Sequence, residues 1–112
     1  MKDYTENGIT VIEVPENIQK DQAELLEEKL FNIYNDKKKN IIIDLREINH
    51  ICSSALGSIV SYKRLLKKED GDIKLIVSSD ELKQLFSITM LNKIFEMYDS
   101  KEEAILSFPE SN

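Results

Sequence analysis

The side chains able to take part in chemistry gather in one short stretch, residues 41–57, which reads IIIDLREINHICSSALG. It contains the only histidine, His50, and the only cysteine, Cys52, followed at once by Ser53 and Ser54. The pattern predicts a fully apolar strand, a polar turn, and two serines that open an amphipathic helix. A hydroxyl at that place lies at the positive end of a helix dipole, where free backbone N–H groups can donate hydrogen bonds to a phosphate. Either serine is therefore a candidate covalent switch.

Each of these side chains also has a structural explanation. Serine is among the most favoured N-cap residues, so capping alone explains either hydroxyl. Cys52 is either a thiol whose pKa is lowered near the helix N-terminus, and so open to oxidation, or a small buried apolar residue, which is the more common case. Asn49 and His50 are either exposed turn residues or contacts for a partner. Gly57 either permits close packing of the helix on a strand or leaves room for a partner.

Composition limits the possible functions. With 112 residues, 41% apolar and 32% charged, we expect one domain, residues 1–112, with a frayed tail at 109–112. A net charge of −6 argues against nucleic-acid binding, which usually needs a basic surface. Because no apolar run approaches the roughly 20 residues of a membrane span and no signal peptide is evident, we expect a cytoplasmic protein without membrane insertion.

Motifs of catalysis and cofactor binding are missing from the sequence. A single cysteine excludes an internal disulfide and a cysteine-based metal cluster. The chain has no GxGxxG, P-loop, HExxH or GxSxG motif. We therefore expect no catalytic residue, no metal and no cofactor, and a protein that is not an enzyme.

The elements that must position residues 41–57 follow from the periodicity of apolar residues. The Asn7-Gly8 pair predicts a hairpin turn between the first two strands. The order is β-β-α-β-α-β-α-β-α, which favours a mostly parallel sheet with right-handed crossovers. The expected strands are 2–6, Ile9–Val14, Ile41–Leu45, Ile73–Val77 and Ile94–Tyr98, and the expected helices are Asp21–Tyr34, Ser54–Lys68, one that follows Ser78, and one that follows Ser100.

In such sheets, function gathers where the carboxyl ends of strands lead into loops. Three loops should meet there, namely Pro15–Lys20, Glu47–Ser54 and Ser78–Asp80. Several local expectations accompany this arrangement. Asp44 should accept hydrogen bonds from the loop that follows it. Capping boxes are expected at Asp21/Glu24, Ser78/Glu81 and Ser100/Glu103. The core residues expected of the second helix are Leu56, Ile59, Val60, Leu65 and Leu66. The same helix has either a docking face or a solvated side formed by Tyr62, Lys63 and Arg64.

The order of elements and the amino-acid sequence of residues 41–57 together resemble the STAS domain, a family named for sulfate transporters and anti-sigma factor antagonists. The family signature is an apolar strand ending in Asp, two apolar positions, and then Asp-Ser-Ser/Ala-Gly-Leu-Gly. This chain has Ile42-Ile43-Asp44-Leu45, Ile48, Ile51 and Cys52-Ser53-Ser54-Ala55-Leu56-Gly57. Further matches are Ile73-Lys74-Leu75-Ile76-Val77, the segment from Leu85 to Asp99, and Ser100-Lys101-Glu102-Glu103-Ala104, so the resemblance runs from about residue 4 to residue 107.

The length resembles the bacterial anti-sigma factor antagonist branch. The resemblance implies a β-α superhelix, with a mostly parallel sheet of four to five strands and four main helices. It also implies a regulator of transcription that binds an anti-sigma factor, itself a serine kinase, and so frees a sigma factor. Phosphorylation of the first serine of the pair, which matches Ser53, breaks that complex, and a phosphatase reverses it. The residues expected to contact the partner are Asn49, His50, Cys52, Ser53, Ser54 and Gly57.

Two residues depart from the family pattern. Cys52 replaces Asp, which removes a charge beside the acceptor hydroxyl, and Ala55 replaces Gly, which favours the helix by roughly 1 kcal/mol but could crowd a partner. These departures motivate an alternative, a non-phosphorylated STAS scaffold subunit of a lipid-transport or stress-signalling complex. A third class, an enzyme or redox sensor built on Cys52 and His50, has the weakest support.

Overall fold

The computed structural model describes residues 1–109, so the last three residues of the predicted frayed tail lie outside the described part, while Pro109 is exposed. The order of elements is the predicted one. The elements are β1 (Lys2–Glu6), β2 (Ile9–Glu13), α1 (Lys20–Asn35), β3 (Asn40–Asp44), α2 (Ser53–Lys67), β4 (Asp72–Ile76), α3 (Asp80–Ile88), the 3₁₀ turn η1 (Leu91–Lys93), β5 (Met97–Tyr98) and α4 (Lys101–Leu106).

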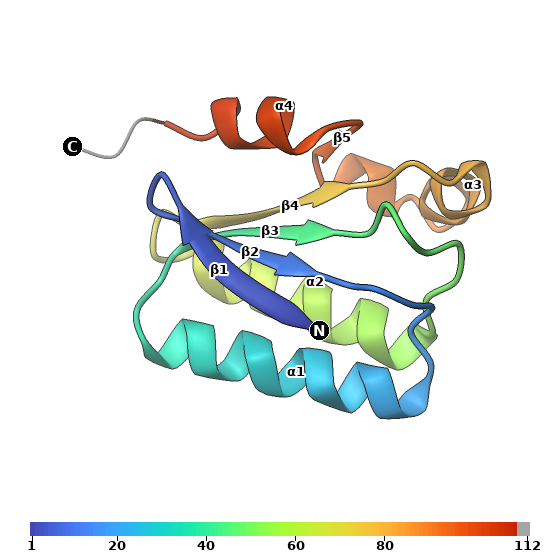
Figure 1. Cartoon of the computed structure of the whole chain (residues 1–112), viewed down its shortest axis with the longest axis horizontal. Coiled ribbons are helices and arrows are strands. Elements are labelled where there is room, and N and C mark those ends of the chain that lie inside the picture. Colours follow the sequence, from blue (N-terminus) through green and yellow to red (C-terminus); the bar gives the residue numbers. More distant parts are fainter. Residues whose placement is uncertain (110–112) are drawn as a thin grey trace.

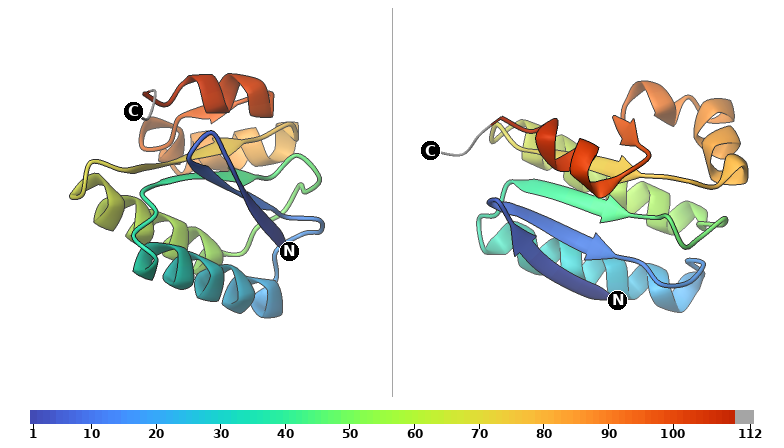
Figure 2. Two further views of the ribbon diagram at one scale, coloured as in Figure 1. Left: turned by 60° about the vertical axis from the view of Figure 1, so that its left-hand side comes forward. Right: turned by 45° about the horizontal axis from the view of Figure 1, so that its top comes forward.

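The five strands form one sheet in the order β1-β2-β3-β4-β5. β1 pairs with β2 antiparallel, and the other neighbours are parallel. Asn7 and Gly8 both have positive φ, 55° and 79°, as the predicted two-residue hairpin requires. Helices α1 and α2 cover one face of the sheet and α4 lies over the other (Figures 1 and 2). The carboxyl ends of β2, β3 and β4 point to the same edge, where α2 begins (Figure 1).

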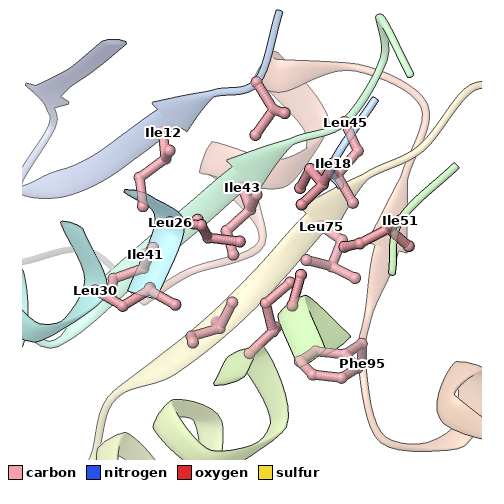
Figure 3. Close-up of a cluster of buried hydrophobic side chains, with 14 of the residues drawn as sticks. Ile12, Ile18, Leu26, Leu30, Ile41, Ile43, Leu45, Ile51, Leu75 and Phe95 are labelled. Carbon is pink, nitrogen blue, oxygen red and sulfur yellow. The ribbon is translucent and has the colours of Figure 1, made fainter. Parts of the chain in front are cut away.

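Most of the apolar core lies between the sheet and helices α1 and α2. Figure 3 shows Ile12, Ile43 and Leu75 of the strands in the same buried cluster as Leu26 of α1. A smaller cluster fills the space beneath α4 on the opposite face. Because β3 carries apolar side chains on both faces, its central isoleucines are fully buried, as expected of a central parallel strand. This burial fixes the position of the loop that leaves β3.

The structure corrects several predicted boundaries and caps. Gln22 takes the expected place of Glu24 at the start of α1, where its side chain accepts from the Gln19 backbone N–H at 3.3 Å. Ser79 rather than Ser78 caps α3, by accepting from the Leu82 N–H at 3.2 Å. Ser100 caps α4 as predicted. The last strand is only Met97–Tyr98, because the chain before it turns through η1.

Helix α2 buries Ile59 and Leu66 as predicted, and Leu56 and Val60 pack partly buried against the core, but two positions differ. Leu65, an expected core residue, is exposed, whereas Lys63 is buried. Lys63 lies four residues after Ile59 and three before Leu66, so it belongs to the same helix face as these buried residues. Its ammonium forms an ion pair with Asp72 of β4 and lies 5.3 Å from the centre of the Phe95 ring. Lys63 is therefore excluded from any solvent-facing docking surface.

Met90 adopts the left-handed conformation, with φ 62° and ψ 13°, directly after Thr89, the C-cap residue of α3. Its side chain is 55% exposed, so packing does not explain this strained backbone. We expect Met90→Gly to raise the free energy of unfolding by about 0.5–1 kcal/mol, because glycine adopts this conformation without the Cβ clash. Urea denaturation measures the change. Met90→Ala is the matched control, since it removes the side chain and keeps the Cβ; an equal gain in both variants would contradict the strain argument.

Candidate functional site

Three loops meet at the edge of the sheet where α2 begins. Together they line a shallow hollow whose walls are residues 15–17, 46–49 and 78–81. This is the convergence that the sequence predicted for the carboxyl ends of β2, β3 and β4. Four exposed carboxylates, Glu16, Glu47, Asp80 and Glu81, border the hollow. The edge is therefore acidic, in keeping with the overall charge of the protein.

The loop between β3 and α2 is fixed at its start by Asp44. The Asp44 carboxylate accepts from the backbone N–H of Arg46 at 3.1 Å and from its guanidinium at 3.0 and 2.7 Å. These contacts, mainly the side-chain hydrogen bond, raise the pKa of Arg46 above its ordinary value. Because Asp44 is buried, the guanidinium compensates a charge that would otherwise be costly. The expected role of Asp44 as an acceptor for the following loop is confirmed.

The end of the same loop is fixed by the segment that follows β2. Ile18 and Ile51 form a parallel β-bridge. The Ile18 N–H donates to the His50 carbonyl at 3.1 Å, and the Cys52 N–H donates to the Ile18 carbonyl at 3.0 Å. Both isoleucines are buried in the main core. The chain is thus held on either side of Ile51, directly before the residues at which α2 begins.

Cys52, and neither serine, occupies the N-cap position of α2. Its backbone is extended, with φ −76° and ψ 160°, and its carbonyl accepts from the Leu56 N–H at 3.1 Å. The capping explanation for Ser53 and Ser54 is therefore wrong, because the tertiary contacts of the loop start the helix one residue earlier than predicted. Ser53 is the first helical residue and is exposed.

The two serines differ in their contacts. The Ser54 hydroxyl lies 3.3 Å from the Cys52 sulfur, and its carbonyl accepts from the Ser58 hydroxyl at 3.2 Å. Among the side chains of residues 1–109, Ser53 has no such hydrogen-bond partner. Of the two, Ser53 is the hydroxyl that faces solvent without a competing contact at the free N–H end of a helix.

Cys52 is partly buried and packs against the main core, so it lies between the reactive thiol and the small buried apolar residue that we considered. The hydrogen bond with Ser54 contributes most to lowering the pKa of the thiol, and backbone N–H groups of Ala55 and Ser54 add to the effect. Partial burial opposes this shift. The pKa of the thiol therefore depends on the local geometry at the start of α2.

The remaining predicted site residues divide into exposed and buried ones. Asn49, His50 and Gly57 are exposed. A Cβ added at Gly57 would have no atom within 4 Å, so the close-packing explanation for this glycine is wrong. Ala55 is fully buried, which means that its methyl group cannot crowd a partner. The structure thus brings five of the six predicted partner-binding residues to the surface around the start of α2, with Cys52 half-buried among them.

Asn17 is the residue of this site that the sequence did not reveal. Its side-chain oxygen accepts from the backbone N–H of Asn49 at 2.9 Å and from that of His50 at 3.2 Å. Its amide nitrogen donates to the Asn49 side-chain oxygen at 2.9 Å. The sequence showed only that Asn17 is a polar residue in a loop predicted to converge with residues 47–54. That it binds Asn49 and His50 follows only from the tertiary structure.

Two properties of residues 1–109 bear on metal binding and on membrane insertion. Among these residues, no cluster of three or more histidine, cysteine or acidic side chains is arranged to hold a metal ion. None of the helices within the same range combines the length and the apolar character needed to cross a membrane.

Comparison with known proteins identifies the fold and the family. The family described as STAS domain matches residues 1–104. The anti-sigma-B factor antagonist of Staphylococcus aureus is 27% identical over 77 residues, which are 69% of this chain and 71% of that protein. The solved structure of an anti-sigma factor antagonist from Mycobacterium paratuberculosis superposes with a TM-score of 0.85 and 22% identity, covering 95% of this chain and 90% of the other.

A second structural neighbour is the Bacillus cell fate determinant SpoIIAA in its phosphorylated form, with a TM-score of 0.73 and 19% identity over 93% of this chain and 95% of that one. At these identities the neighbours show the fold alone, which is the expected mostly parallel five-stranded sheet with four helices. The family match spans the sheet, the three loops and the start of α2 together. This chain belongs to the STAS domain family.

Proposed function

We propose that the protein is an anti-sigma factor antagonist whose binding is controlled by phosphorylation of Ser53. The observation that carries this proposal is the exposed Ser53 hydroxyl, at the first position of α2, beside the edge where three loops meet. The position matches the phosphorylated serine of the family signature. The partner is an anti-sigma factor with serine kinase activity, a cognate phosphatase reverses the switch, and residues 1–112 act as one domain in the cytoplasm.

The chemistry of the switch follows from charge and burial. A phosphate on Ser53 adds about −1.5 to −2 charges and three acceptor oxygens. The free N–H groups at the start of α2 stabilise that phosphate in the unbound protein. In the complex, however, the same group lies on the surface that the partner must cover, next to a loop edge that already carries four carboxylates. Unless the partner supplies cations, covering the phosphate costs several kcal/mol.

Cys52 in place of the family aspartate changes the surroundings of the hydroxyl. The Cys52 thiol forms a hydrogen bond with the Ser54 hydroxyl. Ser53 therefore has no carboxylate at the position directly before it. The kinase that modifies this protein therefore recognises a less acidic acceptor site than the family signature presents. This gives the partner a distinguishing property, namely tolerance of cysteine directly before the acceptor serine.

A phosphorylation assay tests the proposal. The protein is incubated with ATP and, one at a time, with each purified anti-sigma factor kinase of the source organism, and the phosphate is located by mass spectrometry. We expect one phosphate, on Ser53, and none in Ser53→Ala. Ser61→Ala is the matched control, since Ser61 is an exposed serine further along α2, and it should accept phosphate like the unaltered protein. Phosphate on another residue, or on none with every kinase, would favour the scaffold alternative.

A further inference from the structure

We infer that Asn17 is a positioning residue that holds the loop before α2 in the conformation that presents Ser53 to its kinase and partner. The inference rests on the proposed function of Ser53, but it concerns a residue outside the family signature and outside residues 41–57. Its basis is the set of three hydrogen bonds through which one side-chain amide binds the opposite loop.

The chemistry of the contact requires an amide at this position. One oxygen of Asn17 accepts from two consecutive backbone N–H groups, those of Asn49 and His50, while its nitrogen donates to the Asn49 side chain. A carboxylate would keep both acceptor contacts but would place two oxygens against each other, because it has no N–H to donate. An alanine would remove all three contacts.

The contact lies where it can control the start of α2. It is adjacent to the Ile18–Ile51 bridge, so the consecutive residues Asn17 and Ile18 together hold residues 49–52. Cys52, whose N–H is part of the bridge, sets the first turn of the helix and therefore the direction of Ser53. When the Asn17 contacts are lost, the Ile18–Ile51 bridge alone joins the two loops at this point. The backbone of residues 49–51 then becomes more mobile, directly before the helix start that carries Ser53.

Burial separates this role from a contribution to stability. Asn17, Asn49 and His50 are all exposed, so water replaces the lost hydrogen bonds when the Asn17 side chain is removed. Such a loss costs little in global stability, because no buried polar group is left unsatisfied. The value of the contact therefore lies in local order. Asn17→Ala should keep the unfolding midpoint of the unaltered protein while it disturbs the site.

Two measurements test the inference without a partner. The first is the pH dependence of the reaction between Cys52, the only thiol, and the disulfide reagent DTNB; the second is hydrogen exchange at the Asn49 and His50 amides. We expect Asn17→Ala to move the pKa of the thiol toward its ordinary value, because the start of α2 no longer holds the sulfur near its donors. Exchange at both amides should accelerate about twofold, because each loses its acceptor but an exposed hydrogen bond is weak, in agreement with the unchanged unfolding midpoint.

A third measurement connects the contact with the switch. With the kinase that modifies Ser53, we expect Asn17→Ala to lower kcat/KM about tenfold, since loss of about 1.4 kcal/mol of positioning is tenfold in rate. Asn17→Asp, which keeps both acceptor contacts, should recover part of the loss. Asn92→Ala, a change at an exposed asparagine of η1, is the control and should match the unaltered protein in all three measurements.

The outcomes distinguish the inference from the proposed function. If no kinase modifies Ser53, the proposed function fails, and thiol titration and amide exchange still decide whether Asn17 orders the loop. If Ser53 is modified but Asn17→Ala leaves thiol titration, exchange and kcat/KM unchanged, the positioning role is overturned. A lowered unfolding midpoint in both Asn17→Ala and Asn17→Asp would also overturn it, because the contact would then serve global stability.

Discussion

Ser53→Glu is expected to weaken the complex with the anti-sigma factor by about 100-fold or more. The substitution adds a permanent negative charge at the first residue of α2, where the unaltered hydroxyl is exposed and uncharged. Covering an unpaired ion costs several kcal/mol, and each 1.4 kcal/mol is a tenfold change in affinity. Calorimetric titration of the variant into the kinase that modifies Ser53 measures the effect.

Position and charge are separated by two further variants. Ser53→Ala should bind as tightly as the unaltered protein, because it removes the hydroxyl without adding a charge. Thr5→Glu adds the same charge at an exposed position of β1, near the hairpin turn and away from the start of α2, and should leave the affinity unchanged (Figure 1). Equal affinity for Ser53→Glu and the unaltered protein would show that a negative charge at this position does not control binding.

The largest effect on stability is expected at the buried ion pair between α2 and β4. Lys63 and Asp72 are 8% and 9% exposed, and Asp72 also accepts from the Ile73 backbone N–H at 2.8 Å. Asp72→Ala leaves the Lys63 ammonium buried without its partner. We expect the free energy of unfolding to fall by about 3–5 kcal/mol, which is typical when one member of a buried pair is removed. Urea denaturation followed by circular dichroism provides the measurement.

Two comparisons show whether burial is the cause. Lys63→Met combined with Asp72→Ala should be less destabilised than Asp72→Ala alone, because no unpaired charge is left in the core. Asp3→Ala removes one partner of the Lys29–Asp3 pair, whose side chains are 21% and 39% exposed, and should cost no more than about 1 kcal/mol. If the buried and the exposed pair cost the same, desolvation of Lys63 is not what makes the buried pair important.

The amino-acid sequence predicted the path of the chain well because burial leaves a strong periodic signal. The isoleucines of β3 and the alternation of strands and helices indicated a parallel sheet, and the parallel sheet in turn indicated where three loops meet. Helix starts were less predictable. Serine and acidic residues at suitable spacing occur near several starts, and which residue takes the N-cap position is decided by backbone angles that tertiary contacts impose, as at Ser79 and Cys52.

Sequence alone determined a mostly parallel sheet and a pair of serines at the start of its second helix, since both follow from local pattern, and the resemblance to the family signature indicated the STAS type of the sheet. Only the tertiary structure decided which serine is free, which lysine is buried and what holds the loop before α2. The ammonium of Lys63 and the amide of Asn17 each owe their environment to residues of other segments of the chain. Contacts between distant segments leave no periodic trace in the sequence, because they depend on how the loops and strands meet in space.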